Sequence, residues 1–161
     1  MLLGIVSDTH AQLQYTQSAV RMLESLGVEE VIHCGDIGST AVVPLFAAWP
    51  THFVLGNVDH FQADKLAAAI AQAGQMYHAR FGSVTCAGAK IAFLHSDDGD
   101  RFEETIASGE YDLVCYGHTH VAKQELRGKT LVLNPGAIYR ANPHSLAVVE
   151  LPERKATIVS L

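Results

Sequence analysis

Residues 2–34 read LLGIVSDTHAQLQYTQSAVRMLESLGVEEVIHC, and the expected architecture starts from this stretch. A continuous apolar run over 2–6 predicts a buried strand. Residues 12–26 carry apolar side chains at helical spacing until Gly27 ends the pattern, which predicts a helix. Residues 30–34 read as a second buried strand. The order strand, helix, strand is typical of a parallel β-sheet covered by helices.

The rest of the chain continues this pattern and then changes it. We expect further strands at 51–55, 76–80, 84–87, 91–94, 112–116, 122–127, 130–133, 145–150 and 156–160, and helices at 39–48, 64–73 and 100–108. After the helix at 64–73 the alternation of strand and helix gives way to strands joined by turns, which predicts two packed sheets with helices outside. A length of 161 residues suits one buried core, so we expect a single domain over residues 1–161.

Charge and cysteine content exclude some classes of function. A net charge of -6 argues against a protein that holds long nucleic acid, because such proteins cluster Lys and Arg against the phosphates. The three cysteines form no CxxC pair, which favours a reducing compartment. No basic leader precedes the first strand, and no apolar run approaches the roughly 20 residues that span a bilayer. We therefore expect a soluble cytoplasmic protein with no membrane partner.

Side chains that bind metals follow five of the predicted strands. They are Asp8 and His10, then Asp36, Asn57 and His95, and finally His118 and His120 in Gly117-His118-Thr119-His120. Imidazole nitrogen and carboxylate oxygen are ligands of divalent transition metals, and sites in α/β sheets form outside the carboxyl ends of the strands. A carboxylate such as Asp36 can also bridge two ions. The five clusters together predict a metal site.

Each cluster has an ordinary explanation when it is taken alone. Asp8 and His10 fit a loop, and Gly56-Asn57 fits a turn. His95 fits a structural histidine at the end of a strand. Asp36 could cap the next helix, although Ser39 and Thr40 can already do so. The metal site is preferred because all five clusters occupy equivalent strand-end positions.

The order Asp-x-His, Gly-Asp, Gly-Asn-x-Asp, His and Gly-His-x-His resembles the calcineurin-like metallophosphoesterases. The length is similar to that of their small bacterial and archaeal phosphodiesterases, and the likeness runs from Asp8 to Asn134-Pro135-Gly136. It implies a four-layer αββα sandwich with two mixed β-sheets. It also implies one metal held by Asp8, His10, Asp36 and His120, and a second held by Asp36, Asn57, His95 and His118.

The implied reaction is hydrolysis of a small phosphate ester, in the first place a phosphodiester, by a hydroxide that bridges two metal ions. Asp36, Asn57 and His118 would stand at the catalytic centre. Many relatives read Gly-Asn-His and use that histidine as proton donor to the leaving group, whereas this chain has Val58. Acid catalysis typically contributes about 10² to 10⁴ in rate. His60 is the nearest substitute donor, with a plain loop histidine as the alternative.

Other residues near these motifs receive supporting roles. We expect Asp59 to orient a ligand histidine, the loop at Asn134 to line the site by its backbone, and Arg140 to contact phosphate. Asp100 and Glu103 are expected to cap the helix at 100–108, unless the acidic stretch faces the crevice and repels polyanions.

The cofactors implied are two divalent ions, with Mn²⁺ expected and Fe, Ni²⁺ or Zn²⁺ as alternatives. The partner is a small phosphate ester, and a homo-oligomer, either a dimer or a tetramer, stays open. Two other functions also stay open. One is phosphomonoester hydrolysis. The other is a non-catalytic scaffold of the same fold, as in the retromer subunit that has lost ligands, although every predicted ligand is present here.

Overall fold

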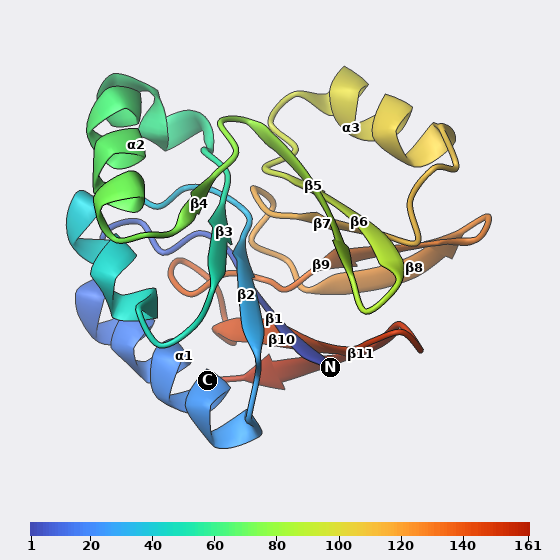
Figure 1. The fold of residues 1–161 in the computed structure, drawn as a ribbon, viewed down its shortest axis with the longest axis horizontal. Helices are drawn as coiled ribbons and strands as arrows, with labels where there is room; N and C mark the ends of the chain where they lie inside the picture. Colours follow the sequence, from blue (N-terminus) through green and yellow to red (C-terminus); the bar gives the residue numbers. More distant parts are fainter.

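The computed structural model describes residues 1–161, and its strands form two mixed sheets (Figure 1). The first sheet has the order β11-β10-β1-β2-β3-β4. Its strands are β1 (Leu2–Val6), β2 (Glu30–His33), β3 (Thr51–Phe53), β4 (Met76–Tyr77), β10 (Ser145–Glu150) and β11 (Lys155–Ser160). Strands β1 to β4 run parallel, while β10 pairs antiparallel with β1 and with β11. The carboxyl ends of β1 to β4 therefore share one edge of the sheet.

The second sheet has the order β5-β6-β7-β9-β8. Its strands are β5 (Phe81–Cys86), β6 (Ala89–Leu94), β7 (Leu113–Tyr116), β8 (Lys123–Arg127) and β9 (Thr130–Asn134). Strands β6, β7 and β9 are parallel, and the two outer strands are antiparallel to their neighbours. The outer strand β8 is mostly exposed, and its Lys123 and Glu125 form an ion pair of 2.8 Å.

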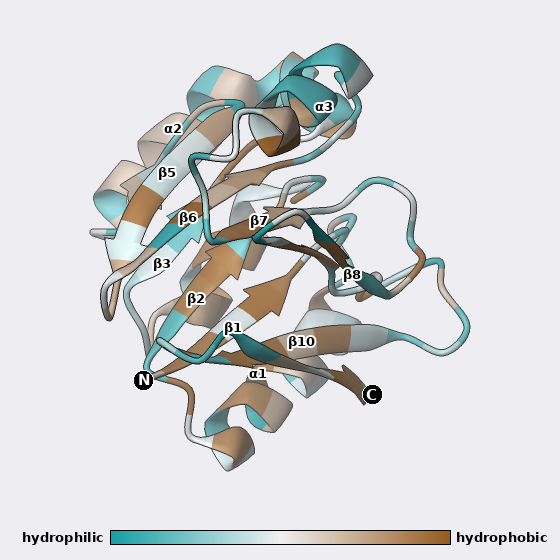
Figure 2. Ribbon diagram, turned by 90° about the vertical axis from the view of Figure 1, so that its right-hand side faces the viewer, coloured by the Kyte–Doolittle hydropathy of each residue, from teal (hydrophilic) through white to brown (hydrophobic).

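Helices cover the outer face of each sheet. Helices α1 (Leu13–Leu26) and α2 (Ala63–Gln72) and the 3₁₀ segment η1 (Thr40–Phe46) pack on the first sheet through an apolar cluster that includes Leu23, Phe46 and Ile70. Helix α3 (Gly99–Ala107) covers the second sheet through Ile106. Between the sheets lies another apolar cluster, to which the largely hydrophobic strands β1 and β2 contribute (Figure 2). The predicted α/β fold with two mixed sheets and helices outside is confirmed.

Most expected elements occur within a residue or two of their predicted bounds. Helix α1 ends where Gly27 adopts φ 70° and its N–H bonds to the carbonyls of Leu23 and Glu24. The stretch expected as a helix at 39–48 is 3₁₀, with Pro44 inside it, and Ser39 caps it by accepting from the N–H of Ala41. The expected strand at 76–80 is reduced to the two residues of β4.

Two local expectations were wrong. Asp98, and not Asp100, caps α3, because its carboxylate accepts from the N–H of Arg101 at 3.1 Å. Glu103 instead pairs with Arg127 at 2.7 Å.

A short 3₁₀ segment, η2 (Asn57–Gln62), follows Gly56 and leads directly into α2. None of the helices has the length and hydrophobicity that crossing a bilayer requires.

Candidate metal centre

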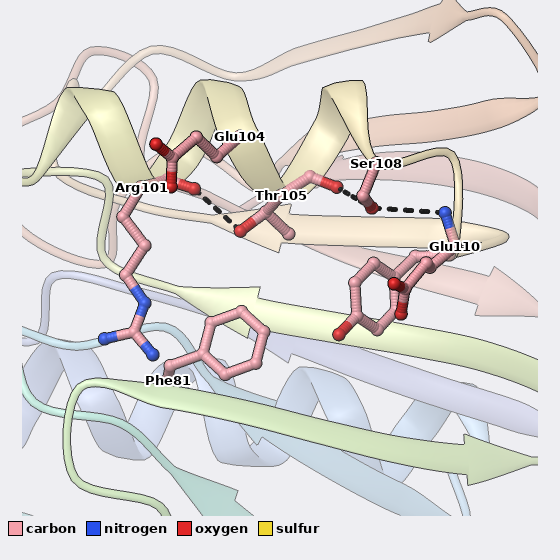
Figure 3. A pocket seen from close by; sticks show the side chains of 7 residues that line it. Phe81, Arg101, Glu104, Thr105, Ser108 and Glu110 are labelled. Atoms are coloured by element: carbon pink, nitrogen blue, oxygen red, sulfur yellow. Dashed lines mark hydrogen bonds between the residues drawn. The ribbon is translucent and has the colours of Figure 1, made fainter.

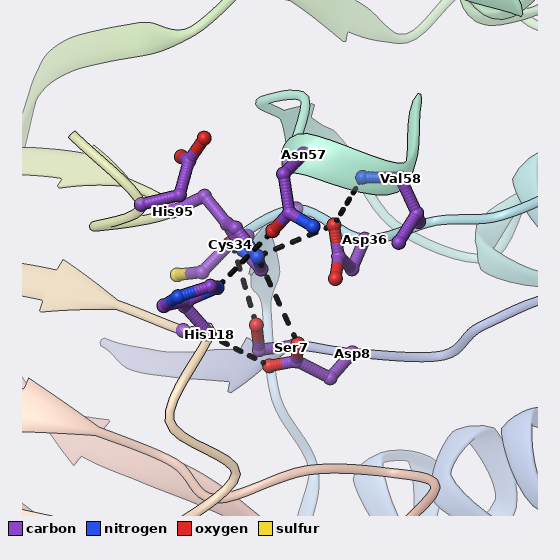
Figure 4. Close-up of polar contacts among 12 residues, drawn as sticks. Ser7, Asp8, Cys34, Asp36, Asn57, Val58, His95 and His118 are labelled. Carbon is purple, nitrogen blue, oxygen red and sulfur yellow. Dashed lines mark hydrogen bonds and ion pairs between the residues drawn. The ribbon is translucent and has the colours of Figure 1, made fainter. Parts of the chain in front are cut away.

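The seven side chains of metal-binding type meet at the strand ends that face each other across the two sheets. Asp8 and His10 follow β1, Asp36 follows β2, Asn57 opens η2, His95 follows β6, and His118 and His120 follow β7. Figure 4 shows Asp8, Asp36, Asn57, His95 and His118 pointing toward one another. The first sheet supplies four of the seven residues and the second sheet supplies three. The site therefore straddles both sheets.

One group consists of Asp8, His10, Asp36 and His120, whose ligand atoms all lie within 4.8 Å of one another. The Nε2 atom of His120 lies 3.1 Å from Asp8 Oδ1 and 3.2 Å from His10 Nε2. His10 Nε2 is 3.7 Å from Asp8 Oδ1 and 3.7 Å from Asp36 Oδ2. These are the four residues expected to hold the first metal, and imidazole with carboxylate is a donor set that suits a divalent ion.

Of the remaining candidates, His95 adjoins the other oxygen of Asp36, and Asn57 and His118 contact each other. His95 Nε2 lies 3.2 Å from Asp36 Oδ1, and His118 Nδ1 lies 3.1 Å from the side-chain oxygen of Asn57. The rings of His95 and His118 meet edge to face with centroids 5.1 Å apart. Asp36 thus has one oxygen toward His10 and the other toward His95, which is the arrangement that a carboxylate shared by two ions needs.

Backbone carbonyls fix the orientation of two of these histidines. The Nδ1 atom of His95 lies 2.8 Å from the carbonyl of Cys34, and the Nδ1 atom of His120 lies 3.2 Å from the carbonyl of Arg140. A carbonyl can only accept, so each Nδ1 carries the proton and each Nε2 offers its lone pair toward the carboxylates. Such hydrogen bonds are the usual support of a metal-binding histidine.

Two buried polar atoms at the centre have no hydrogen-bond partner. They are Asp8 Oδ1 and His95 Nε2. A buried polar atom without a partner is costly, and natural proteins leave few of them. Both atoms are lone-pair donors that face the cluster, so a cation would satisfy them where a hydrogen-bond donor is lacking. The residues present therefore fit divalent metal ions.

Five of the seven candidates have left-handed backbones. The φ angles are 59° at Asp8, 46° at His10, 54° at Asp36, 75° at His118 and 59° at His120. Positive φ is uncommon outside glycine, and such strained conformations cluster at functional sites. Hydrogen bonds between the loops hold them: Asp8 N–H donates to the carbonyl of Gly35, and His10 N–H donates to that of Asp36, each at 3.0 Å.

Two glycines allow the loops to approach this closely. A Cβ atom at Gly117 would lie 2.0 Å from the hydroxyl oxygen of Ser7, and one at Gly56 would lie 2.1 Å from Asp36 Oδ1. Neither distance is possible between real atoms. Any other residue at these positions would push Asp8 or Asp36 out of place.

The electrostatics of the cluster favour ionised carboxylates. Burial raises the pKa of Asp8, but its hydrogen bond with His10 and the charge of His95 outweigh burial, so the pKa is lowered. Burial likewise raises the pKa of Asp36, but the hydrogen bond with His95 and the charge of His95 outweigh burial, so this pKa is also lowered. Burial lowers the pKa of His95, but Asp36 reverses this and the net shift is upward. The two carboxylates are therefore charged and ready to bind a cation.

Asp59 supports the site differently from expectation. None of its hydrogen bonds involves a histidine. Its carboxylate accepts from the backbone N–H groups of Gly38 at 2.8 Å, Gly56 at 2.9 Å and Ile37 at 3.1 Å. Burial raises its pKa, although these three donors oppose the shift. Asp59 therefore ties the loop that carries Asp36 to the loop that carries Asn57.

Asn134 and Arg140 both act on the loop after β7. The Asn134 amide donates to the carbonyl of Gly117 and to the hydroxyl of Thr119, each at 3.1 Å. Arg140 contributes its carbonyl to His120, while its guanidinium carbon lies 5.8 Å from the centre of the Tyr139 ring. Asn134 is buried and Arg140 is exposed. Side-chain amide and backbone carbonyl thus position the two histidines of the motif.

His60, the expected substitute proton donor, is exposed and its Nε2 accepts from the guanidinium of Arg80. Arg80 also donates to Asp97, so it joins the segment after Asn57 to the segment after His95. The sequence does not reveal these contacts, because Arg80 lies far along the chain from both His60 and Asp97 and no motif links the three residues. Val58 donates its backbone N–H to Asp36 Oδ1 at 3.1 Å.

A hollow of about 240 Å³ beside α3 lies apart from this centre (Figure 3). Two of its polar side chains are engaged by the helix itself: Thr105 donates to the carbonyl of Arg101 and Ser108 donates to that of Thr105, each at 2.7 Å. Arg101 lies 4.6 Å from the centre of the Phe81 ring. The hollow is explained by the packing of α3 on the second sheet.

Comparison with known proteins gives a consistent result. The family described as the calcineurin-like phosphoesterase superfamily domain matches residues 1–154. A phosphodiesterase from Methanocaldococcus jannaschii is 34% identical over 139 residues, which cover 84% of this chain and 83% of the relative. The solved structure of an archaeal phosphodiesterase superposes with a TM-score of 0.91 at 30% identity, covering 100% of both chains. Vps29 from Chaetomium thermophilum, at 14% identity, TM-score 0.73 and coverage of 99% and 95%, shares the fold.

Proposed function

The chain belongs to the calcineurin-like phosphoesterase superfamily and is a hydrolase of phosphate esters, and we propose that it cleaves small phosphodiesters at a centre of two divalent metal ions. The proposal rests on one observation: seven side chains of metal-binding type meet, and two of them, Asp8 and His95, each have a buried atom that lacks a hydrogen-bond partner. Relatives named phosphodiesterases match most or all of the chain, which supports a diester as substrate.

In this proposal Asp8, His10, Asp36 and His120 hold one ion, and Asp36 with Asn57, His95 and His118 holds the other. Ions held there would supply a nucleophilic water of lowered pKa and would neutralise the charge of the phosphate. The carbonyls of Cys34 and Arg140 keep the Nε2 atoms of His95 and His120 aimed at the centre. Asp59 and Asn134 hold the ligand loops in register.

The leaving group receives little help from the chain in this scheme. Val58 has no proton to donate, and the Nε2 atom of His60 is engaged by Arg80. An ester whose alcohol leaves readily as an anion needs no acid, so we infer that activated esters are cleaved fastest. We assign no proton donor among the residues at the centre.

Three further assignments belong to the same proposal. Mn²⁺ is the ion we expect to support turnover, with Fe, Ni²⁺ and Zn²⁺ as alternatives, because imidazole and carboxylate sites accept all of these. Residues 1–161 act as one domain. The protein works in the cytoplasm, where its three free buried cysteines stay reduced. It acts as a homo-oligomer, either a dimer or a tetramer.

The test is a substrate screen with Mn²⁺-loaded protein. Bis(p-nitrophenyl) phosphate, p-nitrophenyl phosphate and a cyclic nucleotide are compared at equal concentration, with metal content measured in parallel. We expect the diester to be hydrolysed fastest. Faster hydrolysis of p-nitrophenyl phosphate would make the protein a phosphomonoesterase instead.

Two histidine variants locate the activity. His120→Ala removes a proposed ligand, and we expect it to lose bound metal and at least about 100-fold in kcat. His144→Ala is the matched control, because His144 packs edge-on against Tyr15 outside the cluster and its loss is expected to leave turnover unchanged. Equal turnover by His120→Ala would refute the site. Absence of both metal and turnover in the natural chain would favour a scaffold.

A further inference from the structure

A second cavity of about 250 Å³ opens directly beside the metal centre. His120 forms part of its wall, and the Nε2 atom of the same side chain lies 3.1 Å from Asp8 Oδ1. The wall continues through Val121 and Ala122, which follow the motif, and through Ser145, Ile158 and Ser160 of β10 and β11. The cavity and the proposed metal centre therefore share a side chain.

The wall of this cavity contains no Lys, Arg, Asp or Glu. Its only ionisable side chain is His120, and the remaining groups are small hydroxyls, one amide and aliphatic carbons. The hydroxyl of Ser145 already donates to the carbonyl of Pro135 at 2.7 Å. A charged group placed here would lose its hydration and gain no counter-charge, which is unfavourable. The cavity suits an uncharged group.

The volume limits the size of that group. A cavity of roughly 150 Å³ in another protein holds one benzene molecule, so about 250 Å³ accommodates a single substituted ring. A second phosphate in the cavity would also be repelled by the net charge of -6 of the chain. A diester carries two ester groups, so one of them can lie in the cavity while the other faces away from it.

We propose that the cavity beside His120 binds one uncharged, ring-sized ester group of the phosphodiester substrate. This inference rests on the proposed function, since the phosphate itself lies at the metal centre. It assigns specificity to the junction of the β7–β8 loop with β10 and β11. The expected substrates are diesters that carry an aryl or sugar ring, and dialkyl phosphates are expected to bind poorly.

A binding measurement tests the inference without requiring turnover. Diphenyl phosphate and dimethyl phosphate carry the same charge and differ in the ring. Calorimetry on Mn²⁺-loaded protein is expected to show that diphenyl phosphate binds at least about tenfold more tightly. Equal affinity for the two, or no binding of diphenyl phosphate, would overturn the inference, whereas failure of the proposed function would appear as absence of hydrolysis in the substrate screen.

Matched variants on one strand locate the ring. Ser160→Phe fills the cavity from β11 and is expected to abolish the preference for diphenyl phosphate while metal content stays unchanged. Thr157→Phe adds the same side chain at an exposed position of β11 that does not line the cavity, and it should retain the preference. Ala122→Phe fills the cavity from the loop after β7 and replaces Ser160→Phe if that variant does not fold. A preference that survives in a folded cavity-filling variant would contradict the proposal.

Discussion

Val58 joins the metal centre through its backbone only. Its N–H bonds to Asp36 Oδ1, whereas its side chain is 37% exposed. Any residue other than proline can keep that hydrogen bond, so the side chain can be changed without loss of the contact to Asp36. The position thus offers a direct way to add the missing proton donor.

We expect Val58→His to raise kcat for phosphodiesters with poor leaving groups by about tenfold or more, because a positioned acid typically contributes 10² to 10⁴. Diesters of p-nitrophenol, which leave without a proton, should change little. Val58→Gln is the control, since it adds a polar side chain of similar length that cannot act as an acid. Unchanged or lower turnover in Val58→His with full metal content would contradict the prediction.

His33 shows how a buried histidine outside the centre responds to acid. It is fully buried, its Nδ1 accepts from the N–H of Gly35 at 3.2 Å, and its Nε2 lies 3.0 Å from the hydroxyl of Thr9. Burial lowers its pKa to about 3, from 6.5. The folded protein therefore keeps His33 neutral while the unfolded chain binds a proton below pH 6.5. Stability from this residue is complete above pH 6.5 and is lost as the pH falls toward 3.

The measurement is urea unfolding of chelator-treated protein at pH 7 and pH 5. Each pH unit below 6.5 should cost about 1.4 kcal/mol, so His33 contributes a loss of about 2 kcal/mol at pH 5. His33→Asn does not titrate and retains an acceptor for Gly35. Its unfolding free energy is expected to be lower at pH 7 but to fall less between the two pH values. An equal fall in both proteins would show that His33 is not responsible.

At the scale of elements, the site depends on how closely the segments after the strands approach one another. Gly117 is the tightest example, because a Cβ there would lie 2.0 Å from the Ser7 hydroxyl and 3.0 Å from Asp8 Oδ2. Gly117→Ala is therefore expected to reduce stability by about 2 kcal/mol and to weaken Mn²⁺ binding at least tenfold, roughly the effects of overpacking and of displaced ligands. Thermal unfolding and metal titration measure the two effects.

Two further variants separate this clash from a general effect of losing glycine. Adding Ser7→Ala to Gly117→Ala removes the oxygen at 2.0 Å and should restore part of the stability. Gly99→Ala is the control, because nothing lies within 4 Å of its Cβ position at the start of α3. It should be neutral or slightly stabilising. No recovery in the double variant would mean that the clash lies elsewhere.

The same elements show what the sequence can and cannot predict. Apolar runs and helical spacing located nearly every strand and helix, because most of these elements place side chains in one of the three apolar clusters. The 3₁₀ form of η1 was missed, since Pro44 alters hydrogen bonding within an otherwise helical pattern. Ligand candidates were predictable because they follow strands. Other features could not be predicted from the amino-acid types. These are the backbone carbonyls that accept from His95 and His120, and the left-handed φ of Asp8.

At the scale of the whole molecule, the centre connects the two sheets. Asp8, His10, Asp36 and Asn57 come from the first sheet and the three histidines from the second. Metal bound to both sets, as proposed, would act as a cross-link that exists only in the folded chain. Binding at 100 times Kd should add about 2.7 kcal/mol to stability, which corresponds to a Tm rise of about 5 to 10 °C for a chain of this size.

Differential scanning calorimetry of chelated and Mn²⁺-loaded protein checks this cross-link. The rise in Tm should disappear in His120→Ala, which loses a ligand from the second sheet. It should persist in His144→Ala, which lies outside the cluster. A Tm that Mn²⁺ does not raise in the natural chain would show that metal does not join the sheets.

The exposed edge strand β8 bears on how copies of the chain can associate. Lys123, Glu125 and Arg127 place alternating charge along the only part of that edge that another strand could pair with. Charged edges discourage the strand-to-strand addition that starts fibrils. One edge of the first sheet is β4, which has two residues and is too short to act as a template. Sheet extension at these two edges is therefore a poor route to aggregation.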